Sequence, residues 1–92
     1  MRILGSIGHP VWKITVFRME HRLSLKLETG QYEITYKFRA GEGMESFEDV
    51  KAWIDEAFLE DVRRQFEAMH RAKLATFSRM PAENAGEFGE II

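Results

Sequence analysis

Three stretches in the first half of the chain show the alternation of apolar and polar positions that is typical of β-strands. In residues 22–28 three leucines alternate with polar residues, and in residues 31–39 four apolar residues do the same. Residues 11–19 also predict a strand, but this strand is apolar on both faces: Trp12, Ile14 and Val16 point one way, and Val11, Phe17 and Met19 the other. The sequence therefore raises the question of what covers the second face of this strand.

Short links join the three predicted strands. Residues 20–21 separate the first pair, and a turn at residues 29–30 separates the second, where Gly30 can adopt the positive φ that a tight hairpin requires. Such short links allow only antiparallel neighbours, so the three strands are expected to form a meander. Residues 1–10 contain two glycines and a proline and have no clear period, so we expect a flexible N-terminal arm there.

A helix is expected to begin after Ser46, whose hydroxyl can cap it, with Asp49 three residues later as in a capping box. Residues 47–80 have helical composition, but their apolar positions fall on two displaced stripes. We therefore predict a break near Asp55–Ala57, with Asp55 as a second N-cap, although one kinked helix stays possible. Pro81 would end the second helix, and residues 81–92 are expected to be a disordered acidic tail.

The predicted fold is α+β: a three-stranded antiparallel β-meander, followed by two helices or one kinked helix packed on one face of the sheet. A chain of 92 residues with 45% apolar and 30% charged residues suits one globular domain, which we expect to span residues 11–80. No window is long and apolar enough for a membrane span or a secretory signal, and cysteine is absent. A cytoplasmic protein with no membrane association is therefore expected.

Catalytic and metal-binding patterns are missing from the sequence. The absence of cysteine excludes a thiolate zinc site and a cysteine nucleophile, and no nucleotide-binding or hydrolase motif occurs. His9, His21 and His70 lie in separate segments and lack the spacing of a helical metal site. We therefore expect no enzyme activity, no cofactor and no bound metal.

Spare apolar residues indicate protein contacts instead. If the helices cover one face of the sheet, the other face keeps an apolar strip of Val11, Phe17 and Met19 beside lysines and threonines, which is typical of a contact surface. The last helix is long enough to overhang the sheet and expose a second group, Leu74, Phe77 and Met80. We predict a small protein-interaction module that self-associates through these two groups, as a homodimer.

Charge is sorted along the chain and supports this prediction. Residues 42–61 hold eight acids and one lysine, a charge of −7, whereas residues 62–80 hold five bases and one acid, a charge of +4. These two blocks attract one another in an antiparallel pair of chains. The alternative is a nucleic-acid-binding module that uses a basic open sheet face with Lys13, Lys26, Lys37 and Arg39. Acids at the start of the first helix oppose that alternative, because they would repel a phosphate backbone.

Overall fold

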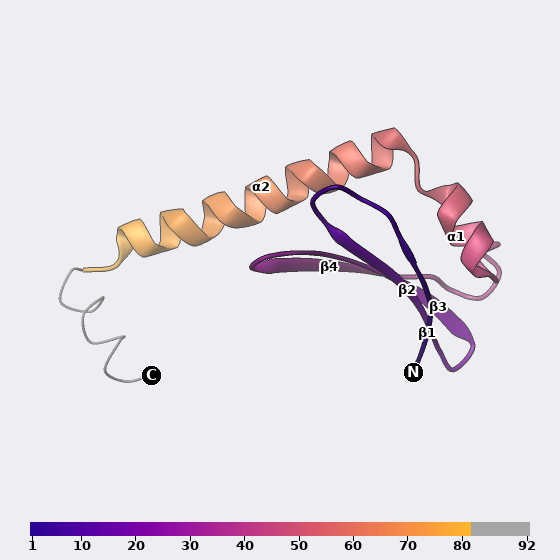
Figure 1. Cartoon of the computed structure of the whole chain (residues 1–92). Helices are drawn as coiled ribbons and strands as arrows, with labels where there is room; N and C mark the ends of the chain where they lie inside the picture. Colours follow the sequence, from indigo (N-terminus) through magenta and orange to yellow (C-terminus); the bar gives the residue numbers. More distant parts are fainter. Residues whose placement is uncertain (82–92) are drawn as a thin grey trace. The chain divides into compact units, whose positions relative to one another are not determined.

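The structure is a computed structural model that describes residues 1–81. Its elements are β1 (Arg2–Ile7), β2 (Lys13–Met19), β3 (Arg22–Thr29), β4 (Tyr32–Lys37), α1 (Phe47–Trp53) and α2 (Glu56–Arg79) (Figure 1). The chain forms two compact units, Met1–Glu60 with the sheet, α1 and the first turn of α2, and a second unit that begins at Asp61. The fold is α+β, as predicted, and the predicted tail lies, from residue 82 on, outside the described residues.

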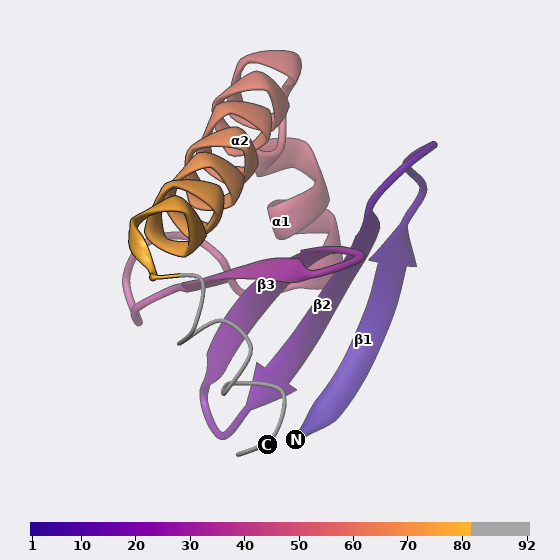
Figure 2. The ribbon, with the colours of Figure 1, turned by 90° about the vertical axis from the view of Figure 1, so that its left-hand side faces the viewer.

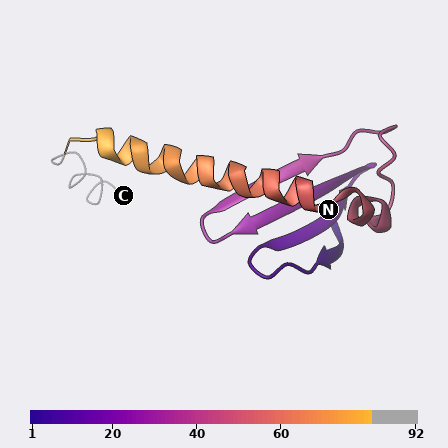
Figure 3. The ribbon, with the colours of Figure 1, turned by 90° about the horizontal axis from the view of Figure 1, so that it is seen from above.

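The sheet has four antiparallel strands in the order β1-β2-β3-β4, so the prediction of three strands is wrong. The additional strand, β1, comes from the segment that was expected to be a flexible arm. Its pairing with β2 contains a bulge between Ile3 and Gly5, and this bulge disturbs the alternation that identifies a strand in the sequence. Figure 3 shows the hairpin turns that join the successive strands.

His9 organises the connection between β1 and β2. Its Nδ1 accepts hydrogen bonds from the backbone N–H groups of Val11 and Trp12 at 3.1 and 3.0 Å. The imidazole also stacks on the Trp12 indole, with ring centroids 4.4 Å apart. Local hydrogen bonds of this kind fix the turn that connects β1 to β2.

The core lies on one face of the sheet. The fully buried side chains of the strands are Ile14, Val16, Leu23, Leu25 and Leu27, each at most 1% exposed. The strand register places Val16 opposite Leu25 and Leu25 opposite Tyr36, so a continuous apolar row crosses the sheet. Burial of this row supplies the main driving force for folding of the sheet, at about 25 cal/mol per Å² of apolar surface.

α1 begins as the sequence predicts. Ser46 Oγ accepts a hydrogen bond from the N–H of Asp49 at 3.2 Å, and the Asp49 carboxylate accepts one from the N–H of Ser46 at 3.1 Å. This reciprocal capping box satisfies two N–H groups that have no partner within the helix. The Asp49 carboxylate also accepts a hydrogen bond from the N–H of Glu45 at 3.0 Å.

The predicted break between two helices is confirmed. α1 ends at Trp53, and Ile54 adopts an extended conformation with φ −76° and ψ 119°. Asp55 then caps α2, because its Oδ1 accepts a hydrogen bond from the N–H of Phe58 at 2.7 Å. Asp55 is therefore the N-cap that the sequence indicated, and no glycine or proline is needed at the break.

α1 packs on the face of the sheet that carries the core (Figure 2). Phe47 lies against Gly5 of β1 at one end of the helix. At the other end Trp53 contacts Phe38 and Tyr36, with ring centroids 5.1 and 6.1 Å apart, and Phe58 joins them at 4.6 Å from Trp53. Aromatic packing therefore joins β4, α1 and the first turn of α2.

Candidate interaction surface on the open face of the sheet

The opposite face of the sheet carries exposed apolar side chains from two neighbouring strands. Phe17 and Met19 of β2 have the parity opposite to the buried Val16, and the register places Ile3 of β1 directly opposite Phe17. Phe17 and Met19 line a hollow of about 500 Å³ together with Met1. Met1, Ile3 and Met19 are 84%, 65% and 49% exposed. We call these four residues, Met1, Ile3, Phe17 and Met19, the open-face strip.

The open-face strip differs from the predicted one at two points. Val11 is 73% exposed, but it precedes β2 and does not line the hollows beside Phe17. Met1 and Ile3 were missed, because the segment that contains them was expected to be an arm. The signal that could have found them is the apolar pair at positions 1 and 3, which has the period of a strand.

Charged side chains of both signs surround the open-face strip. Lys13 and Lys26 line a second hollow of about 280 Å³ with Met1, Ile3 and Phe17. Lys26 Nζ lies 3.4 Å from a carboxylate oxygen of Glu28. On β4 the same face carries Glu33 and Lys37, which line the larger hollow. The face is therefore of mixed charge.

Thr15 lies at the centre of this face, opposite Ser6 on one side and Lys26 on the other. It is 7% exposed, and its hydroxyl oxygen is buried with no hydrogen-bond partner among the described residues. A buried hydroxyl without a partner costs about 1–3 kcal/mol. The Thr15 hydroxyl therefore lowers the stability of the folded protein at the centre of this face.

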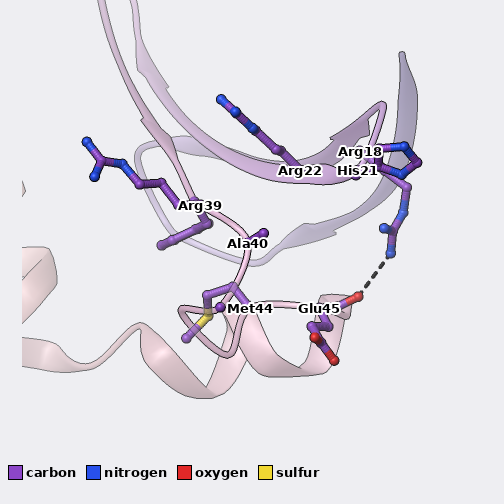
Figure 4. Close-up of a pocket in the computed structure, with 9 residues that line it drawn as sticks. Arg18, His21, Arg22, Arg39, Ala40, Met44 and Glu45 are labelled. Atoms are coloured by element: carbon purple, nitrogen blue, oxygen red, sulfur yellow. Dashed lines mark hydrogen bonds between the residues drawn. The ribbon is translucent and has the colours of Figure 1, made fainter.

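Arg39, predicted to belong to the basic surface, follows β4 and lines a different hollow of about 240 Å³ with Arg18 and Arg22 (Figure 4). The Arg18 guanidinium donates a hydrogen bond to the backbone carbonyl of Glu45 at 2.9 Å. Figure 4 shows Arg22 and Arg39 extending away from Arg18, so the three cations do not converge on one point. The larger open-face hollows include Lys13, Lys26 and Lys37 but not Arg39.

The second predicted contact group lies at the end of α2, with Met80 directly after its last residue. Phe77 and Met80 line one hollow of about 440 Å³ together with Ala72, Lys73 and Thr76. Leu74 is 50% exposed and Phe77 56%, but Leu74 is outside this hollow. Within its own unit, the end of α2 therefore presents Phe77 and Met80 as neighbours and Leu74 separately.

Among residues 1–81 no group of three or more metal-ligating side chains is placed to hold an ion. The helices of this part of the chain include none that is long and apolar enough to cross a membrane. The chain matches no protein-family model, no curated protein and no solved structure. Any functional conclusion therefore depends on the surfaces described above.

Proposed function

We propose that this chain is a small non-enzymatic protein-interaction module that self-associates through the open face of its sheet. The observation that supports this is the open-face strip, in which four large apolar side chains from adjacent strands gather on one exposed face. An exposed apolar patch with a polar rim is typical of protein contact surfaces. Phe77 and Met80 at the end of α2 are a second candidate contact. The absence of cysteine suits the cytoplasmic location that we propose.

The mixed charge of the open face favours a protein over a nucleic acid. Lys13, Lys26 and Lys37 share the face with Glu28 and Glu33. A phosphate backbone needs a surface of one sign, because its affinity comes from neutralised phosphates and released counterions. An isologous protein interface can use both signs, because charges of opposite sign on one patch complement a copy of that patch.

Light scattering after size-exclusion chromatography, over a concentration series, tests this proposal. We expect the wild-type protein to associate and the Phe17→Ser variant to associate about tenfold more weakly or worse. Val11→Ser is the matched control, because Val11 is exposed and apolar but outside the open-face strip. Met19→Ser is a second test variant in case Phe17→Ser does not fold, which circular dichroism would detect.

A wild-type protein that stays monomeric at the highest concentration would overturn the proposal. So would a folded Phe17→Ser variant with the same mass as the wild type at every concentration. Absorbance at 260 nm, recorded in the same runs, tests the nucleic-acid alternative. A high 260 nm signal that disappears with added salt would favour a nucleic-acid partner bound by Lys13, Lys26 and Lys37.

A further inference from the structure

The sheet has an edge at β1 and an edge at β4, and the two differ in regularity. β1 is interrupted by the bulge between Ile3 and Gly5, and bulges protect an edge against pairing with another chain. β4 is paired with β3 in regular register along its whole length, from Tyr32 to Lys37. β4 therefore presents the edge on which a further strand can add.

The alternation of backbone groups along β4 shows which ones face outward. The N–H of Phe38 donates to the carbonyl of Leu23 at 2.9 Å, so position 38 faces β3. In an antiparallel ladder the hydrogen-bonding direction alternates from residue to residue. The backbone N–H and C=O groups of Glu33, Thr35 and Lys37 therefore point away from β3, toward the open edge.

We propose that β4 of one copy pairs antiparallel with β4 of a second copy, with Thr35 on the two-fold axis. The product is a continuous sheet of eight strands. Thr35 then lies opposite Thr35 of the second copy, and Glu33 lies opposite Lys37 on both sides of the axis. All of these positions have outward backbone groups, as hydrogen-bonded pairs require.

The charges favour this register over the registers with the axis at Glu33 or at Lys37. A two-fold axis at Glu33 would place two glutamates opposite each other, and an axis at Lys37 would place two lysines opposite each other. Like charges directly opposite are destabilising, whereas opposite charges stabilise a strand pair. The axis at Thr35 forms two Glu33–Lys37 pairs at once.

Within one copy, neither of these charges has a favourable partner. Glu33 lies opposite Glu28 in the β3–β4 ladder, and Glu28 is close to Lys26 instead, at 3.4 Å. Lys37 lies opposite Ser24, and no ion pair of Glu33 or Lys37 is found among the described residues. A second copy supplies the cation that Glu33 lacks and the anion that Lys37 lacks.

The other face of the paired strands is also complementary. With Thr35 on the axis, Ile34 lies opposite Tyr36 of the second copy, and Tyr32 lies opposite Phe38. In each copy Tyr36 already packs against Phe58, with ring centroids 5.2 Å apart. Pairs of an aromatic and a β-branched residue, and pairs of two aromatic residues, stabilise neighbouring strands. The contact therefore extends the aromatic packing of each copy across the axis.

This edge contact does not depend on the open-face proposal, because a copy that continues the sheet sideways leaves the open-face strip uncovered. The two contacts can be separated by testing the edge in Phe17→Ser protein, in which the face contact is weakened. We expect Phe17→Ser protein to be smaller than the wild-type assembly, which has both contacts, but to remain a dimer through β4. Adding Lys37→Glu should weaken that dimer about tenfold or more, and adding Glu33→Lys as well should restore it.

The molecular masses of the variants distinguish the edge contact from the open-face contact. If Phe17→Ser protein is already monomeric at the highest concentration, the edge contact is overturned and the face contact is supported. If Lys37→Glu does not change the mass of Phe17→Ser protein, or the double charge exchange does not restore it, the edge contact is also overturned. Failure of the open-face proposal has a different signature, which is an unchanged mass on going from wild type to Phe17→Ser.

Thr35→Pro gives an independent test that does not rely on charge. Proline removes the central outward N–H, and it is tolerated on an edge strand where that N–H faces solvent. In the Phe17→Ser background we expect Thr35→Pro to give a monomer and the control Thr35→Val, which keeps the N–H, to give a dimer. A folded Thr35→Pro protein that remains a dimer would overturn the proposed pairing.

Discussion

A Cβ atom on Gly5 would lie 2.8 Å from Cε1 of Phe47, so the ring at the start of α1 occupies the space that a side chain on β1 would need. The absence of a side chain at Gly5 therefore allows the helix to approach the sheet. We expect Gly5→Ala to lower the free energy of unfolding by about 1–3 kcal/mol, because the added methyl overpacks this contact. Urea denaturation measures the change.

Gly8→Ala is the matched control for Gly5→Ala. A Cβ on Gly8 would meet nothing within 4 Å, and we expect no loss of stability there. Combining Gly5→Ala with Phe47→Leu should recover part of the lost stability, because the smaller side chain can move aside. Equal stabilities of the Gly5→Ala and Gly8→Ala proteins would contradict the contact between β1 and α1.

Thr15→Val is expected to stabilise the protein. The Thr15 hydroxyl is buried without a hydrogen-bond partner among the described residues, and valine replaces it with a methyl group of similar size. Removing such a group should raise the free energy of unfolding by about 1 kcal/mol. Thermal and urea unfolding measure the change, with the exposed Thr35→Val as a control that should stay within about 0.5 kcal/mol. A loss of stability in Thr15→Val would mean that the hydroxyl is hydrogen-bonded.

Asp55→Ala should destabilise the start of α2. The carboxylate accepts the N–H of Phe58 at 2.7 Å, and loss of an N-cap costs about 0.5–2 kcal/mol. Asp55→Asn is the conservative control, since asparagine caps about as well as aspartate. Denaturation curves of the two variants should therefore separate, with the asparagine variant close to wild type. Coincident curves would show that capping by Asp55 contributes little.

Asp49 should make the free energy of unfolding depend on pH in the acid range. Hydrogen bonds from the backbone N–H of Glu45 and then from the side chain of Ser46 hold the pKa of the Asp49 carboxyl below its ordinary value of 3.8. Because the folded state favours the carboxylate, its stabilising effect is fully present above pH 3.8 and is lost as the pH falls through the folded-state pKa. Asp49→Asn should therefore be less stable than wild type at neutral pH, with the difference shrinking in acid.

An NMR titration of the Asp49 side-chain carboxyl carbon measures that pKa directly. We expect a midpoint below 3.8 in wild type and a higher midpoint in Ser46→Ala, which loses one of the hydrogen bonds. A wild-type midpoint at or above 3.8 would contradict the capping geometry.

The parts of the fold that local patterns encode were predictable. Strict alternation over residues 22–28 and 31–39 corresponds to β3 and β4, and a hairpin joins them as predicted. The expected positive φ at Gly30 is wrong, because positive φ among residues 1–81 occurs at Glu20, Gly41 and Gly43 instead. The break between the helices was also predictable, because Asp55 stands where one apolar stripe ends and the other begins. These features depend on residues that are close in the sequence, so they can be predicted without knowledge of the tertiary structure.

β1 was not predictable by the same reasoning. The bulge at Leu4 moves Gly5 and Ile7 to the core face while Ile3 stays on the open face, so no single period covers the segment. Gly5 also lowers the strand propensity of the segment. A glycine is needed at this position because Phe47 of α1 packs against it, and this tertiary contact is not visible in the local sequence. Missing β1 in turn removed Met1 and Ile3 from the predicted contact surface. Val11 was included because the predicted strand began at residue 11, whereas β2 begins at Lys13.

The strand order has a consequence for the kinetics of folding. Every strand pairs with the next strand along the chain, so the sheet is built from local hairpins, and a topology of this kind folds fast for a β-protein. The contact of Phe47 with Gly5 instead closes a long loop, and we expect it to form after the transition state. Stopped-flow measurements should then show that Gly5→Ala accelerates unfolding with little change in the folding rate, whereas Leu25→Ala in the central hairpin slows folding. The protein would thus assemble its sheet first and attach α1 last.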